Sequence, residues 1–85
     1  MNIYVGNLDY GLQEDELKVL FNEYGQVASV KIIKDKYTGR GKGFGFVEMV
    51  DVNEASNAIN ELDGAELKNR KIIVNKARPE RKIGF

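Results

Sequence analysis

The octapeptide Lys-Gly-Phe-Gly-Phe-Val-Glu-Met, which starts at Lys42, constrains the fold of this chain more than any other stretch. Side chains of a β-strand point alternately to opposite faces, so one face of this strand carries Lys42, Phe44, Phe46 and Glu48. The other face carries only glycine, valine and methionine. Because the aromatic residues share their face with charges, that face is expected to be open to solvent. Alternation alone slightly favours the opposite interpretation, with both rings in the core, since phenylalanine is commonly buried.

A second alternating segment near the N-terminus decides between these interpretations. The sequence Ile-Tyr-Val-Gly-Asn-Leu places Tyr4 on the face opposite to Ile3 and Val5. On a neighbouring strand, Tyr4 would share a surface with the two phenylalanines of the octapeptide. Large exposed rings suit flat ligands, and stacking one nucleic-acid base on one aromatic side chain contributes roughly 1–3 kcal/mol. The two segments together favour an exposed aromatic surface that binds bases.

The two segments resemble the hexamer and octamer motifs of the RNA-recognition motif family, whose octamer reads Lys/Arg-Gly-Phe/Tyr-Gly/Ala-Phe-Val-x-Phe/Tyr. Lys42 to Val47 match this octamer position by position. Met49 departs from it, because Phe or Tyr is usual at that position. By alternation Met49 points to the core, so we expect altered packing and an unaltered ligand surface. Within the family, the chain looks most like the small single-domain bacterial RNA-binding proteins.

Helical and strand patterns around these motifs follow the order β-α-β-β-α-β. Apolar residues at helical spacing predict a helix over 12–24, with Gly25 as a left-handed cap, and Asp51 caps a second helix. The glycines of the octamer indicate a strand that a packed helix crosses closely. Further strands are expected over 27–34, 66–70 (a short hairpin that turns at Asn69) and 72–77. This order predicts an α+β fold, a ferredoxin-like sandwich with a four-stranded antiparallel sheet and two helices on one face.

The length of 85 residues allows one domain, which we assign to 1–78, followed by a short basic C-terminal tail over 79–85. Because Met1 stands almost directly before the first strand, we expect a nearly stand-alone domain. The chain contains no Cys and no His, so no metal, cofactor or copper-carrying function is expected. No stretch approaches the roughly 18 apolar residues of a membrane span, and no leader opens the chain. These features predict a soluble, cytoplasmic protein.

Charge is unevenly distributed along the sequence. The 13 basic and 13 acidic residues give a formal net charge of zero, which by itself argues against binding to nucleic acid. However, residues 31–42 and 68–82 are basic, whereas 1–30 and 43–67 are acidic. Segregation along the chain favours segregation between faces of the fold. We therefore expect a polarised surface.

The candidate site is the open face of the predicted sheet, where aromatic rings lie among cations. Alternation places these side chains on it: Tyr4, Lys31, Ile33, Lys42, Phe44, Phe46, Glu48, Ile73 and Asn75. The family resemblance implies that Tyr4 and Phe46 stack on bases, that Phe44 packs against sugars, and that Lys42 pairs with a phosphate. Rings interleaved with cations on a flat sheet suit single-stranded RNA, which is the expected partner.

The end of the last strand extends this candidate site. The resemblance implies main-chain contacts to base edges from Lys76, Ala77 and Arg78. Arg40, in the basic segment before the octamer, is a further RNA-binding candidate. Single-stranded DNA stays open as a ligand because stacking does not depend on the sugar. We expect the protein to act as a monomer.

Two other functional classes are weighed against RNA binding. A protein-interaction module of the same fold could use the exposed sheet face for a peptide, and this alternative stays open. An enzyme is disfavoured, because the sequence offers no Cys or His nucleophile or base and no evident pair of buried carboxylates. Neither common glycine-rich phosphate-binding motif can be laid over the glycines at 39, 41, 43 and 45.

Overall fold

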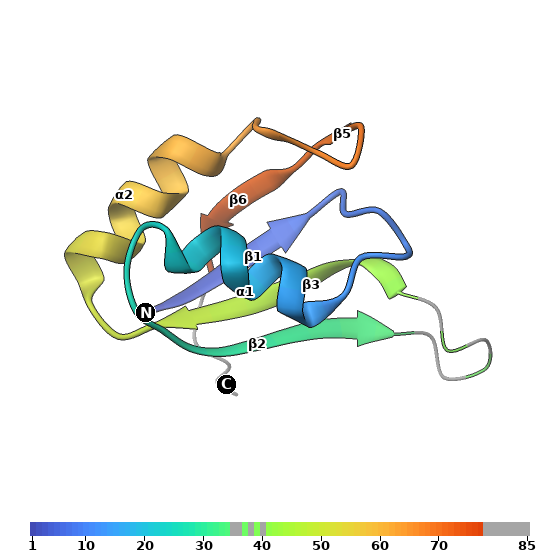
Figure 1. Cartoon of the computed structure of the whole chain (residues 1–85), viewed down its shortest axis with the longest axis horizontal. Helices are drawn as coiled ribbons and strands as arrows, with labels where there is room; N and C mark the ends of the chain where they lie inside the picture. Colours follow the sequence, from blue (N-terminus) through green and yellow to red (C-terminus); the bar gives the residue numbers. More distant parts are fainter. Residues whose placement is uncertain (35–36, 38, 40, 78–85) are drawn as a thin grey trace, which may run out of the picture.

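The chain forms a four-stranded sheet with two helices, as a computed structural model shows (Figure 1). The structure describes residues 1–34, 37, 39 and 41–77, and at residues 41 and 42 it describes only the backbone. In chain order the elements are β1 (Asn2–Gly6), α1 (Glu14–Asn22), β2 (Val27–Lys34), β3 (Gly41–Met49), α2 (Val52–Leu62), β4 (Glu66–Leu67), β5 (Arg70–Lys71) and β6 (Ile73–Lys76).

The main sheet is antiparallel with the strand order β2-β3-β1-β6. The two motif strands, β1 and β3, are therefore the central pair, and both helices cover the same face of the sheet (Figure 1). Strands β4 and β5 form a separate short hairpin between α2 and β6. The predicted ferredoxin-like β-α-β-β-α-β arrangement is confirmed. No helix in the described part of the chain is long and apolar enough to cross a membrane.

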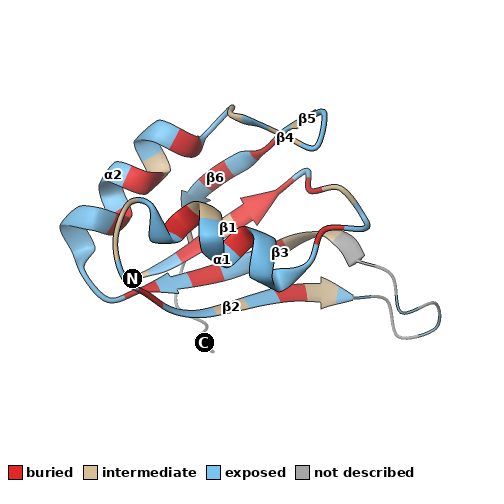
Figure 2. Cartoon of the chain, in the orientation of Figure 1, coloured by how far each residue is buried: buried red, intermediate tan, exposed pale blue. Residues whose placement is uncertain are grey.

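The hydrophobic core lies between the helices and the covered face of the sheet (Figure 2). Helix α1 contributes Leu17 and Phe21, and α2 contributes its buried alanines and Leu62. The small alanine side chains allow α2 to approach the sheet closely. Met49 is fully buried in this core, so its predicted inward direction is correct. The position that departs from the family octamer therefore belongs to packing.

Helix α1 is shorter than expected and ends differently. It begins after Gln13, whose backbone N–H donates to Glu16 Oε1 at 2.9 Å, and it ends at Asn22. The prediction of a left-handed cap at Gly25 is wrong, because Gly25 does not have a positive φ. A Cβ at Gly25 would lie 2.7 Å from Glu54 Cβ on α2. Glycine is needed here for space between the helices and not for a left-handed turn.

Local capping and turn residues behave as the sequence indicated elsewhere. Asp51 Oδ2 accepts a hydrogen bond from the Glu54 backbone N–H at 2.8 Å and caps α2. In the β4–β5 hairpin, Lys68 and Asn69 have φ values of 51° and 68°. Two successive residues with positive φ are typical of the tight turn that matches the twist of a hairpin. The short hairpin turning at Asn69 is confirmed.

Gly45 is small for a reason that the sequence did not indicate. A Cβ at this position would lie 2.5 Å from the Lys31 carbonyl oxygen and 3.0 Å from Ile32 Cα. Both atoms belong to the backbone of β2, so the close neighbour of this glycine is the adjacent strand. The closest constraint on Gly45 therefore comes from the adjacent strand, whereas the sequence indicated a packed helix.

The edge strands of the sheet have backbone donors satisfied by carboxylates. On β2, the Ile32 N–H donates to Glu14 Oε2 at 3.0 Å. On β6, the Val74 N–H donates to Asp63 Oδ1 at 3.0 Å. Unpaired edge groups are templates for pairing with another chain, and side chains that occupy them oppose it. Both edges are thus partly protected against strand addition.

Candidate nucleic-acid interface

A row of four side chains crosses the open face of the sheet. Tyr4 on β1 lies directly opposite Phe46 on β3 and directly opposite Asn75 on β6. Phe46 in turn lies opposite Lys31 on β2. Residues that pair across antiparallel strands project to the same face, so one row presents a cation, two aromatic rings and an amide. We call these four residues the central row.

The next row along the strands contains Phe44, which pairs with Gly6, which pairs with Ile73. The ring of Tyr4 leans over Gly6, because a Cβ there would lie 2.9 Å from Tyr4 Cζ. A residue with a side chain at position 6 would push the ring away. Glycine at this position therefore allows the Tyr4 ring to lie close to the sheet and near Phe44.

The three rings form one contiguous cluster, which we call the aromatic trio. The centroids of Tyr4 and Phe44 are 6.1 Å apart with an interplanar angle of 30°. Tyr4 and Phe46 are 5.9 Å apart at 64°, and Phe44 and Phe46 are 6.2 Å apart at 87°. These spacings fall within the range of favourable aromatic pairs. The trio therefore presents ring surface in more than one orientation.

The trio lies outside the core. Phe46 is 37% exposed, whereas its chain neighbour Val47 is 0% exposed. Tyr4 and Phe44 are half-buried, because the rings partly cover one another. Ile73 is 45% exposed at the edge of the same face, and Ile33 is half-buried. The interpretation that the phenylalanines are core residues is thus wrong.

A polar row flanks the central row on its other side. Glu48 pairs with Ser29 on β2 and with Asn2 on β1. The Ser29 hydroxyl donates to Glu48 Oε1 at 3.4 Å. Near the same end of the sheet, the Ala77 N–H donates to the Asn2 carbonyl at 2.9 Å. That N–H is therefore already hydrogen-bonded within the protein, so a main-chain contact from Ala77 to a base would have to use the carbonyl oxygen.

Several cations around the trio are not paired. Lys31 and Lys76 are exposed, and neither contacts a carboxylate of any residue that the structure describes. Among those residues the ion pair is that of Lys68 Nζ with Glu16 Oε2, at 3.2 Å. Two candidates, Arg40 and Arg78, lie outside the described residues. The side chain of Lys42 also lies outside them.

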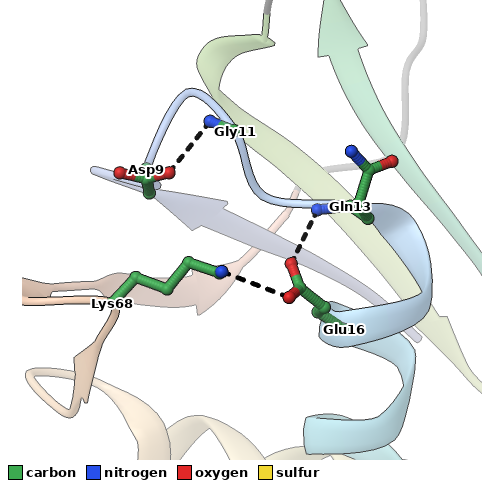
Figure 3. Close-up of polar contacts among 5 residues, drawn as sticks. All are labelled: Asp9, Gly11, Gln13, Glu16 and Lys68. Carbon is green, nitrogen blue, oxygen red and sulfur yellow. Dashed lines mark hydrogen bonds and ion pairs between the residues drawn. The ribbon is translucent and has the colours of Figure 1, made fainter.

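Polar contacts order the loop between β1 and α1 and join the first turn of α1 to the β4–β5 hairpin (Figure 3). Asp9 Oδ2 accepts from the Gly11 N–H at 2.9 Å and thereby fixes the turn that follows β1. Glu16 accepts from the Gln13 N–H and pairs with Lys68 of the hairpin. The Gln13 hydrogen bond and, next, the Lys68 ammonium lower the pKa of the Glu16 carboxyl below its usual value of 4.5.

The turn over 9–11 carries an aromatic residue that the sequence analysis did not place in the site. Tyr10 is 56% exposed, and the guanidinium carbon of Arg70 lies 5.6 Å from its ring centroid. Its position in a turn directly after the hexamer motif is the sequence signal. The role of Arg70 has no local signal, because the contact joins segments 60 positions apart.

The exposed aromatic trio lies on the two central strands of a β-α-β-β-α-β fold. The sequence also matches a protein-family model. The model described as RNA recognition motif matches residues 3–73. The chain belongs to the RNA recognition motif family. This confirms the resemblance that the two strand motifs indicated.

Proteins whose names refer to RNA binding are similar to nearly the whole chain. “Putative RNA-binding protein RbpE” of Nostoc sp. is 50% identical over 84 residues, covering 99% of this chain and 85% of that protein. The crystal structure of “RNA Binding Protein PG1” shares 54% identity with a TM-score of 0.89, and covers 94% of this chain and 99% of that one. The structure of “Rna15 RRM with bound RNA (GU)” shares 28% identity with a TM-score of 0.82, covering 96% and 86%.

Proposed function

We propose that this chain binds single-stranded RNA by stacking bases on the aromatic trio. The single observation that carries the proposal is that Tyr4, Phe44 and Phe46 are contiguous and on the uncovered face of the sheet. Aromatic side chains on a flat sheet are a recurrent platform for unstacked RNA bases. Membership of the RNA recognition motif family and the RNA-bound Rna15 structure further support RNA over a peptide.

Roles for the surrounding residues follow from what each side chain can offer. Lys31 and Lys76 flank the trio, pair with no carboxylate of the described residues, and are suited to phosphates. Asn75 lies beside Tyr4 and has both a donor and an acceptor for a base edge. Glu48 can only accept hydrogen bonds when ionised, so it favours base edges that present N–H donors. Lys42, Arg40 and Arg78 are proposed as additional phosphate contacts, and Ile33 and Ala77 as apolar or main-chain contacts.

The proposed complex is weak. Two or three stacked bases contribute roughly 1–3 kcal/mol each, against an association cost of roughly 4–15 kcal/mol. Phosphate contacts are few and screened by salt, and the net charge of zero adds no long-range attraction. We therefore propose micromolar binding to a few nucleotides. We also propose that the protein acts as a monomer, because both edge strands are partly protected against strand addition. A cytoplasmic site of action stays a prediction.

The experiment is to replace Phe44 and Phe46 together by Ala and to titrate fluorescein-labelled GUGU RNA by anisotropy. Loss of two stacking positions should weaken binding by about 30-fold or more, since each stacked base contributes roughly 1–3 kcal/mol. Circular dichroism should show unchanged helix and sheet content, because both rings lie outside the core. Val19→Ala, at a 63% exposed position on α1, is the control and should bind like wild type. Wild-type affinity in the double variant would overturn the proposal.

A further inference from the structure

The turn after β1 presents an exposed tyrosine beside an arginine that no carboxylate of the described residues neutralises. Tyr10 is 56% exposed, and the guanidinium carbon of Arg70 lies 5.6 Å from the ring centroid, within the range of a cation–π contact. A tyrosine that served only to hold the turn would be expected to bury its ring. Here the residue is 56% exposed, although a planar cation lies against its ring.

Arg70 is held in place without being neutralised. Its Nη2 donates to Asn7 Oδ1 at 3.2 Å, and Asn7 Nδ2 donates to the Lys71 carbonyl at 2.7 Å. Asn7 has a φ of 56°, a conformation that asparagine tolerates better than most residues. Arg70 Nε is buried without a hydrogen-bond partner, and no described carboxylate pairs with the guanidinium. The charge is therefore positioned but left free to bind an anion.

Tyr10 also lies against Gly43, the residue that precedes Phe44 of the aromatic trio. The ring edge rests against β3, because a Cβ at Gly43 would lie 3.2 Å from Tyr10 Cε1. Gly43 has a φ of 91°, which other residues adopt only with strain. Phe44 of the trio is the next residue, so its Cα lies about 3.8 Å from that of Gly43. A single strand of RNA that leaves the trio at Phe44 would reach Tyr10 within a short span.

We propose that Tyr10 and Arg70 form an additional nucleotide subsite, which takes one residue of single-stranded RNA beyond those held by the trio. This inference rests on the proposed function. A nucleotide has both groups that this pair of side chains can bind: a flat base that stacks on the Tyr10 ring and a phosphate that pairs with the Arg70 guanidinium. Arg70 then contacts the phosphate with its outer nitrogens while Tyr10 stacks on the base, and Asn7 is the positioning residue for Arg70.

The test compares two labelled RNA probes by fluorescence anisotropy. The tetramer GUGU is short enough to be held by the trio, whereas the octamer GUGUGUGU extends to Tyr10. Tyr10→Ala should weaken octamer binding by about fivefold or more and leave tetramer binding unchanged, in keeping with the contribution of one stacked base. Tyr10→Phe keeps the ring and should restore octamer binding, whereas Tyr10→Leu keeps bulk but not the ring and should not.

The charge of Arg70 is tested separately, through the salt dependence of RNA binding. Arg70→Gln should reduce the slope of log affinity against log salt for the octamer by about 0.7, the amount expected for one phosphate on a single strand. The tetramer slope should not change. Arg70→Lys keeps the charge and should retain the slope. An unchanged octamer slope in Arg70→Gln would overturn the phosphate contact.

The outcomes separate the subsite from the proposed function. If Tyr10→Ala binds the octamer like wild type while Phe44→Ala/Phe46→Ala does not, the subsite is overturned and RNA binding by the trio stands. An equal loss for tetramer and octamer in Tyr10→Ala also overturns a separate subsite. If wild-type protein binds neither probe, the proposed function itself fails.

Discussion

Tyr4 and Phe46 lie directly opposite each other on β1 and β3, with their ring centroids 5.9 Å apart. This pairing joins the two family motifs, which are far apart in the sequence, into one surface. It also places Lys31 and Asn75 at the two ends of the same row, so that a polar side chain flanks the pair of rings on each side.

Gly6→Ala should weaken RNA binding indirectly, because the added methyl group would displace the neighbouring Tyr4 ring. The added Cβ would lie within about 3 Å of the Tyr4 ring, which must move away from Phe44. We expect GUGU affinity to fall by about 1–3 kcal/mol, the contribution of one stacked base. Anisotropy on Gly6→Ala, Tyr4→Ala and the double variant measures the coupling. If the two effects are additive, Gly6 does not act through Tyr4.

Met49→Ala should destabilise the protein and leave the ligand surface intact. Met49 is 0% exposed, and truncating a buried Met to Ala costs about 2–5 kcal/mol in free energy of unfolding. Phe46→Ala, three residues earlier on the open face, should cost less stability and more affinity. Urea denaturation should show the larger loss of stability for Met49→Ala. RNA titration should show the larger loss of affinity for Phe46→Ala. Weaker RNA binding by the folded Met49→Ala protein would assign Met49 to the binding surface.

Lys31 and Lys76 should each make a defined phosphate contact, whereas a lysine on the helical side of the sheet should not. Lys31→Gln and Lys76→Gln should each reduce the slope of log affinity against log salt by about 0.7 for single-stranded RNA. Lys18 is exposed on α1, on the helical side of the sheet, and provides the matched control. Lys18→Gln should leave the slope unchanged. A similar decrease for all three variants would indicate diffuse electrostatic attraction in place of defined phosphate contacts.

Protonation of the Glu16 carboxyl should make the free energy of unfolding depend on pH under acidic conditions. The Gln13 N–H and the Lys68 ammonium both favour the charged form, so the folded-state pKa lies below 4.5. The stabilisation is therefore fully present above pH 4.5 and is lost as the pH falls through the folded-state pKa. Lys68→Met should raise the Glu16 pKa toward 4.5 without reaching it, because the larger Gln13 contribution remains. NMR titration of the carboxyl carbon measures both values, and an unchanged pKa would exclude Lys68 as a cause.

Much of this architecture can be predicted from local sequence, because it depends on short-range periodicity. Alternation in the octamer separated Phe46 from Val47, and the same rule placed Tyr4 and Asn75 on the open face. The cap at Asp51 and the turn at Asn69 were found because capping and turn geometry depend on a few adjacent residues. These features need no knowledge of how distant segments pack.

Features that depend on tertiary contacts were missed or misread. Gly25 looked like a helix cap, but it is small because Glu54 of α2 packs against it. Gly45 is restricted by the backbone of β2, which the sequence of β3 does not reveal. The contact of Arg70 with Tyr10 likewise joins two segments that are distant in sequence. In each case the partner residue carries no local signal of the contact.

Stacking of bases on the aromatic trio is tested most directly by an NMR titration of the aromatic side-chain signals with GUGU RNA. The ring signals of Tyr4, Phe44 and Phe46 should shift together and show through-space contacts to base protons. Signals of the core ring Phe21 should stay in place, since that residue is fully buried beneath α1. RNA-induced shifts that occur on the helices while the three rings remain unchanged would contradict stacking on the open face of the sheet.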